Sequence, residues 1–202
     1  MNILKKLICI ILSTIFIITL SGCNGKTDAQ TSNNSEKKVQ EIKTEDKNEV
    51  QQEEPKFKTI VKGTVNKIEN YCQFTINDVK FGKKIIPPKP SGVYTYYEAK
   101  EPGTTYLDTV VNIKSLLKEG ELADRFLKVE VIYDNKYTYS TFSTIEENGG
   151  DNFTYTNIKS LEPLKSGNVH FIAEVPEEVS TNTKSVVIVI STNNEELRYN
   201  FR

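Results

Sequence analysis

The residue types that do most protein chemistry are scarce in this 202-residue sequence, which has one histidine and three cysteines. His170 stands between Val169 and Phe171 in a segment where apolar residues alternate. The alternation predicts a strand with Val169 and Phe171 on its apolar face, so the imidazole should point the other way, to solvent or half-covered by a loop. The sequence shows no partner for general base catalysis beside it, and we interpret His170 as a structural residue.

The cysteines offer little catalytic or metal-binding chemistry. Cys72 shares its strand parity with Phe74, which predicts a small buried hydrophobic side chain and not a reactive thiol. The other two, Cys9 and Cys23, lie in the N-terminal region. A zinc site would need more ligands than Cys72 and His170 supply, and we predict no metal site of this type.

Paired carboxylates could perform acid–base chemistry, but here they fall in or beside predicted turns, where acidic side chains are normally hydrated. The pairs are Glu146–Glu147, Glu177–Glu178 and Glu195–Glu196. The sequence has no Gly-x-Ser-x-Gly elbow and no glycine-rich phosphate-binding motif. We therefore predict no catalytic residue, no cofactor and no enzymatic activity; a cell-envelope hydrolase is the less favoured alternative.

One loop is rich in oxygen ligands of the kind that Ca²⁺ prefers. The segment Glu146–Asn152 reads EENGGDN. Its spacing does not match the EF-hand loop, and a hairpin with an Asn-Gly turn explains the same residues. We predict a hairpin here, and calcium binding stays an open alternative.

Tyrosine is the residue type that best suits a binding surface, because its ring offers apolar area and a hydroxyl group at low entropy cost. Tyrosines gather before one predicted strand and in one predicted hairpin. The candidate binding surface comprises Tyr94, Tyr96, Tyr97, Tyr137 and Tyr139. The alternative is that tyrosine simply has a high preference for strands.

Period-two alternation recurs through the rest of the chain and predicts strands separated by turns rich in Gly, Pro, Asn and Asp. The predicted inward faces include Leu107, Val111 and Ile113 in one strand, Leu127, Val129, Val131 and Tyr133 in a second, and Val169, Phe171, Ala173 and Val175 in a third. A bulge or bend is expected at Gly82, and a hairpin turn at Asp134–Lys136. About seven to eight strands predict an all-β fold, an immunoglobulin-like antiparallel β-sandwich, with a closed barrel as the alternative.

The N-terminus has the layout of a secretory signal peptide, which we assign to residues 1–22. Lys5 and Lys6 precede an apolar run from Leu7 to Leu20. The run is shorter than the roughly 20 residues that span a bilayer, so a permanent transmembrane helix is the weaker interpretation.

The end of this run, Leu20-Ser21-Gly22-Cys23, resembles the lipobox of bacterial lipoproteins. The resemblance implies cleavage before Cys23 and a diacylglyceryl group on its sulfur. Two acyl chains anchor a protein stably, whereas one holds only marginally. We therefore expect a chain anchored to the cell membrane and facing outside the cytoplasm; an ordinary secretory cleavage site is the alternative.

Residues 23–58 carry the lipidated cysteine and a polar linker that we predict to be disordered, because it contains too few apolar side chains to form a core. The folded domain is assigned to residues 59–202. A net charge of −1 argues against a nucleic-acid partner, which requires a concentrated basic face. The expected partners are the membrane and an unidentified cell-envelope protein or glycan.

The order of the predicted elements resembles the immunoglobulin-like domains of Gram-positive surface lipoproteins, a group related to secreted immunoprotective antigens of mycobacteria. The resemblance spans residues 68–201 and includes an aromatic–acid–Gly segment before a long strand that ends in Asn, here Tyr97, Glu98, Gly103 and Asn112. It implies the sandwich fold and a non-catalytic binding or accessory role. A structural spacer or adhesion element is the alternative function.

Overall fold

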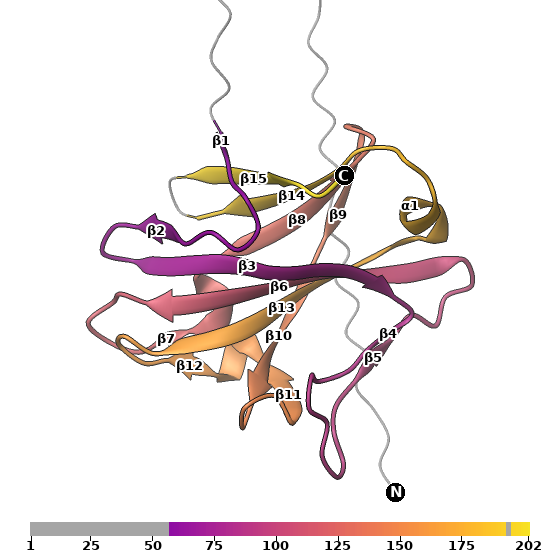
Figure 1. Cartoon of the computed structure of the whole chain (residues 1–202). Coiled ribbons are helices and arrows are strands. Elements are labelled where there is room, and N and C mark those ends of the chain that lie inside the picture. The colour runs from indigo at the N-terminus through magenta and orange to yellow at the C-terminus, as the bar shows by residue number, and fades with distance from the viewer. Residues whose placement is uncertain (1–56, 193–194) are drawn as a thin grey trace, which may run out of the picture. The chain divides into compact units, whose positions relative to one another are not determined.

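The strands form two sheets that face each other across one main core (Figure 1). The computed structural model describes residues 57–192 and 195–202 of the chain. The predicted signal peptide (1–22), the lipobox with Cys23, and the linker as far as residue 56 lie outside the described residues. Within them, the all-β sandwich fold is confirmed.

The larger sheet contains six strands in the order β11-β10-β13-β6-β3-β2. Its pairs are all antiparallel. The strands are β2 (Asn66–Ile68), β3 (Cys72–Gly82), β6 (Thr104–Ser115), β10 (Phe142–Glu147), β11 (Asn152–Tyr155) and β13 (Ser166–Pro176).

The second sheet contains five strands in the order β1-β15-β14-β8-β9. Its strands are β1 (Lys58–Thr59), β8 (Lys128–Tyr133), β9 (Tyr137–Ser140), β14 (Val186–Ser191) and β15 (Glu196–Asn200). The pair of β1 and β15 is parallel, and the others are antiparallel. A small pair, β7 (Glu121–Leu122) with β12 (Ser160–Leu161), lies outside both sheets.

The main core lies between the two sheets, and the three inward faces predicted from alternation are confirmed. Their residues are buried together with Cys72, Phe74 and Ile76 of β3. Burying such side chains supplies most of the stability of a fold of this kind, at about 25 cal/mol for each Å² of apolar surface.

The predicted hairpin turn at Asp134–Lys136 is confirmed, and of the bulge or bend expected at Gly82 the structure shows a bend, at the adjoining Lys83. Asp134 and Asn135 both have positive φ angles, 53° and 54°, as a two-residue hairpin turn requires. The irregularity in β3 lies between Ile76 and Asp78, where the register with β6 shifts. Gly82 instead ends β3.

A short hairpin arm leaves the sandwich after β3 and covers the outer face of the six-stranded sheet. Its strands are β4 (Lys84–Ile85) and β5 (Tyr97–Glu98), and we call residues 83–99 the arm. Ile85 packs with Tyr106, Phe153 and Ile172 in a second, smaller core cluster. Part of the outer face of this sheet is therefore buried beneath the arm.

Helical structure is limited to short segments in the described residues. They are the 3-10 helices η1 (Ala123–Arg125) and η2 (Thr156–Ile158) and the α-helix α1 (Glu177–Thr181). No helix among residues 57–192 and 195–202 is long and apolar enough to cross a membrane.

Candidate functional site

His170 is buried, with 3% of its surface exposed, so the prediction of a solvent-facing or half-covered imidazole is wrong. The alternation had placed it on the correct face of β13, opposite the main core. The arm and the β10–β11 hairpin cover that face, and the ring of Phe153 packs edge-on against the imidazole at 4.8 Å between centroids. The alternation of residues along a strand does not show whether another part of the chain covers its outer face.

Both ring nitrogens of His170 lie within hydrogen-bond distance of a carboxylate. Nδ1 is 3.0 and 3.1 Å from the two carboxylate oxygens of Asp108, and Nε2 is 3.1 Å from Oε1 of Glu146. The register explains the arrangement, because His170 pairs with Val110 of β6 and with Thr144 of β10. Asp108 and Glu146 are each two residues from these partners and therefore point to the same face.

Two asparagines continue the network along the same face. Nδ2 of Asn168 donates to Oε2 of Glu146 at 3.0 Å, and Nδ2 of Asn112 donates to Oδ1 of Asn168 at 2.8 Å. On the other side, Nζ of Lys80 lies 4.0 Å from the fully buried Asp108 carboxylate. A polar chain thus crosses four neighbouring strands, β3, β6, β13 and β10.

The geometry favours the doubly protonated imidazolium form of His170. A carboxylate accepts hydrogen bonds only, so both nitrogens can donate only when each carries a hydrogen. Burial lowers the pKa of His170, but the hydrogen bonds and negative charges of Asp108 and Glu146 raise it, and the net shift is upward from 6.5. The imidazolium thus lies between two carboxylates, and Lys80, 4.0 Å from Asp108, supplies the second positive charge of the cluster.

Glu146 corrects the expectation that the carboxylate pairs are simply hydrated. Its side chain is 12% exposed and faces His170, whereas Glu147, on the opposite face of β10, lies 3.3 Å from Nζ of the exposed Lys159. Asp108 was not singled out from the sequence at all. The available signal was a charged residue inside a long apolar strand, but its partner could be identified only from the strand register.

A small polar hollow of about 190 Å³ adjoins the network. Its lining includes the side chains of Asn112, Glu146 and Asn168 and the backbone of Gly149 and Gly150. These groups can form hydrogen bonds, and the hollow has room for a few water molecules. A larger hollow of about 630 Å³ is formed by Asn70 and residues 116–121 and contains none of these network residues.

The Glu146–Asn152 segment is the predicted hairpin, with positive φ angles at Asn148 and Gly149. Several of its oxygens already have partners within the protein. Oδ1 of Asn152 accepts the backbone N–H groups of Phe153 and Thr95, both at 2.8 Å. In the part of the chain that the structure describes, no group of three or more His, Cys, Asp or Glu side chains is arranged to hold a metal ion.

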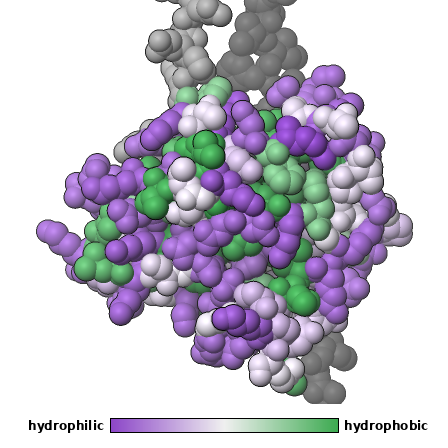
Figure 2. Space-filling view, in the orientation of Figure 1, coloured by the Kyte–Doolittle hydropathy of each residue, from purple (hydrophilic) through white to green (hydrophobic). Residues whose placement is uncertain are grey.

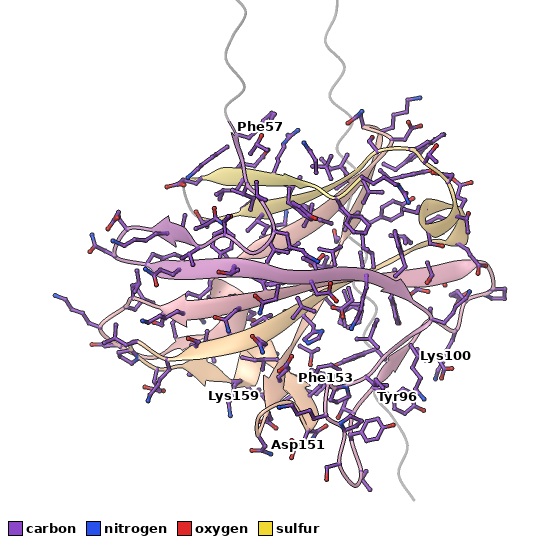
Figure 3. All side chains as sticks on the ribbon, viewed as in Figure 1. Phe57, Tyr96, Lys100, Asp151, Phe153 and Lys159 are labelled. Atoms are coloured by element: carbon purple, nitrogen blue, oxygen red, sulfur yellow. The ribbon has the colours of Figure 1, made fainter. Side chains whose placement is uncertain are left out.

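The candidate tyrosines do not form one surface. Tyr94 and Tyr96 lie on the 86–96 loop of the arm, with their rings 6.5 Å apart, and Tyr96 is 47% exposed. Tyr97 packs inward against Phe142, with the ring centroids 5.0 Å apart. Figure 3 places Tyr96 in the lower part of the view, at the opposite end of the domain from Phe57.

The other two tyrosines lie on β9, in the second sheet. Tyr137 is 54% exposed and stacks on Tyr133 at 6.1 Å, whereas Tyr139 is half-buried against the main core. In Figure 1 the β8–β9 turn lies at the upper end and the 86–96 loop at the lower end. The exposed tyrosines thus form two separate sites.

Cys72 is fully buried and unpaired, as expected for a structural side chain. Burial raises the pKa of its thiol to about 12. A thiol of this kind contains almost no thiolate at neutral pH and is a poor nucleophile.

The two-sheet architecture and its covered outer face place the protein in the class of β-sandwich proteins, and comparison with solved structures identifies the group. A crystal structure of an uncharacterized β-sandwich protein from Clostridium difficile 630 is 32% identical in sequence, with a TM-score of 0.68. The match covers 74% of this chain and 97% of that chain. The chain belongs to the family of that β-sandwich protein.

A second structure, of a conserved hypothetical protein from Bacillus anthracis, is 12% identical with a TM-score of 0.46, over 67% of this chain and 91% of that chain. No family model matches the sequence. No curated protein matches it either.

Proposed function

We propose that the protein is a lipid-anchored module of the cell envelope that binds a surface protein or glycan outside the cytoplasm and does no catalysis. The anchor is the diacylglyceryl group that the lipobox Leu20–Cys23 implies. The finer family suggested by the sequence, the immunoglobulin-like surface lipoproteins, is part of this proposal.

The observation that carries the binding role is the position of the arm tip. Val93 is 99% exposed, and Tyr94 and Tyr96 stand beside it. The tip lies at the end of the domain opposite Phe57, where the described chain begins (Figure 3). The tip is therefore remote from the point at which an N-terminal tether would join the described domain.

The surface chemistry supports a local contact of this kind. On the face shown in Figure 2, hydrophilic residues predominate and the apolar residues form separate patches between them. Exposed tyrosines on a rigid support provide contact area at low entropy cost. Nζ of Lys84 lies 3.9 Å from the centre of the Tyr96 ring and holds this side chain in place.

The environment of His170 favours binding over hydrolysis. Its two nitrogens already face Asp108 and Glu146, so neither is available to take a proton from a nucleophile without breaking the network. Cys72 is fully buried and is therefore not placed to act as a nucleophile.

Crosslinking on intact cells tests the binding role. We expect Tyr96→Ala to weaken the affinity for the captured partner by about thirtyfold, which corresponds to the roughly 2 kcal/mol of one aromatic hot-spot contact. Tyr137→Ala is the matched control, because it removes an equally exposed tyrosine at the other end of the domain. Equal capture by both variants and the native protein would contradict the assignment to the arm tip.

Cell fractionation tests the anchor independently. We expect Cys23→Ser to abolish labelling by radioactive palmitate and to move the protein from the membrane fraction to the soluble fraction. Retention of the serine variant on membranes would exclude an anchor at this residue.

A further inference from the structure

One attachment of the arm to the rest of the domain is the β10–β11 turn, which follows Glu146. The carbonyl oxygen of Gly150 accepts the backbone N–H of Lys89 at 2.8 Å. A Cβ atom added to Gly150 would lie 2.7 Å from Cγ of Pro88 and 3.2 Å from Oε2 of Glu146. The Glu146 carboxylate, the turn and the arm are therefore packed in direct succession, with Asn152 as a second attachment through Thr95.

A chain of aromatic rings connects the imidazole to the arm by a second route. The ring of His170 contacts Phe153 at 4.8 Å, and Phe153 lies 6.1 Å from Tyr97 of β5. Tyr97 and Phe153 both contribute to the small core under the arm. The imidazole is thus linked to the arm in two ways: through Glu146 and the Gly150 turn, and through the rings of Phe153 and Tyr97.

The charged groups around His170 are balanced only while the imidazole carries both protons. Asp108 faces it from β6 and Glu146 from β10, and Lys80 of β3 lies 4.0 Å from Asp108. From β11 the ring of Phe153 packs against the imidazole, and Tyr97 of the arm packs against Phe153. The β10–β11 turn also carries Asp151, whose Oδ1 is buried with no hydrogen-bond partner.

Removing one proton from the ring reverses the sign of one contact. A deprotonated nitrogen presents a lone pair to a carboxylate oxygen at about the 3 Å separation seen here, and both groups are then acceptors. Asp108 is fully buried and is also fixed by β6, whereas Glu146 borders the turn and is partly exposed. Glu146 is the partner with room to move.

We propose that His170 acts as a proton-operated latch for the arm, which is closed while the imidazolium bridges Asp108 and Glu146 and is released when the bridge loses its proton. Release moves Glu146 outward, loosens the Gly150 turn and breaks its hydrogen bond to Lys89. Since Tyr94 and Tyr96 are carried by the arm, the latch regulates the display of the binding tip; this last clause rests on the proposed function.

The direction of the pH dependence follows from the raised pKa of His170. The hydrogen bond and the charge of Glu146 are among the causes that raise this pKa, and opening removes them, so the pKa is higher in the closed form than in the open form. Such a group stabilises the closed form fully at pH values below its open-form pKa. The stabilisation is lost as the pH rises through the raised value. The arm should therefore be closed in mildly acidic surroundings and open more often in alkaline ones.

Amide hydrogen exchange, measured by NMR between pH 6 and pH 9, tests the latch in the native chain. After correction for intrinsic exchange, we expect the opening equilibrium at the Lys89 and Thr95 amides to rise along the titration of the His170 ring. The rise is about tenfold for each pH unit by which the closed-form pKa exceeds that of the open form. Ile188, in β14 of the second sheet, is the reference amide and should show no such rise.

Glu146→Gln and Glu147→Gln form a matched pair of variants on the two faces of β10. Removing the Glu146 charge should lower the His170 pKa and abolish the pH-dependent opening of the arm, because the Gln amide can donate to a deprotonated ring nitrogen. Glu147→Gln should leave both the pKa and the opening unchanged. Titration of His170 without any change at Lys89 and Thr95, or equal behaviour of the two variants, would overturn the proposal. No partner is needed in this experiment, so a failure of the proposed binding function would not affect its result.

Discussion

The carboxylate of Asp108 is fully buried on the outer face of the six-stranded sheet, and its compensation should matter for the stability of the domain. Its close partners are His170 at 3.0 Å and Lys80 at 4.0 Å. A buried ion pair is weak evidence for net stabilisation, but removing one member leaves an uncompensated charge. Removing one member of the pair should therefore destabilise the domain more than removing both charges.

His170→Ala should lower the free energy of unfolding at pH 6 by about 3–5 kcal/mol, because it leaves Asp108 without its main partner. The double variant His170→Ala with Asp108→Asn should recover a large part of this loss, since the charge of the fully buried carboxylate is then removed and Glu146 is partly exposed. Urea denaturation followed by circular dichroism measures both values. If the double variant is as unstable as the single one, the loss comes from the cavity and not from the charge.

The site depends on the contact between the β10–β11 turn and the arm. Substitutions at two adjacent glycines of this turn allow the effect of backbone strain to be distinguished from that of packing against the arm. Gly149 and Gly150 both have positive φ angles, 78° and 97°, where any Cβ atom causes strain. At Gly149 an added Cβ would meet no atom within 4 Å, whereas at Gly150 it would meet Pro88 of the arm. Only the second substitution should push the arm away from the turn.

Gly149→Ala should cost about 1 kcal/mol, from backbone strain alone. Gly150→Ala should cost about 2–3 kcal/mol, because the clash with Pro88 adds to the strain. The free energy of unfolding and the exchange rate of the Lys89 amide measure the two effects separately. Equal costs for the two variants would show that the arm does not press on the turn.

The strands of the sandwich could be predicted from the sequence because each main strand buries one face. Alternation in β6, β8 and β13 identified the inward residues, and the Asp134–Asn135 turn followed from residue chemistry. The candidate site could not be predicted in the same way. His170 was assigned to the correct face, but its cover is an irregular, proline-rich arm with no periodic pattern, and its partners come from strands far apart in sequence.

At the scale of the whole molecule, the core belongs to one compact unit that contains the described residues from Phe57 to Arg202. Every residue of the main cluster lies between Ile60 and Leu197. The stability of the sandwich should therefore be independent of the residues before this unit.

A chain that starts at Gln51 should fold and unfold with the same thermal midpoint as the chain that starts at Cys23, since both contain the whole core. Differential scanning calorimetry of the two proteins gives the comparison. A large drop in the midpoint of the shorter chain would mean that residues 23–50 contribute to the folded domain. In that event the assignment of residues 23–58 to a linker would be wrong.

The parallel pair of β1 and β15 sets how the domain would respond to mechanical tension. β1 has two residues, and the adjoining Ile60 donates its N–H to the carbonyl oxygen of Arg198 and is buried in the core. A pull through the N-terminal side would load this short contact before any long strand. Residues 57–61 would detach from the sheet first, and each would lengthen the extended chain by roughly 3.3–3.6 Å. The rest of the sandwich would stay folded.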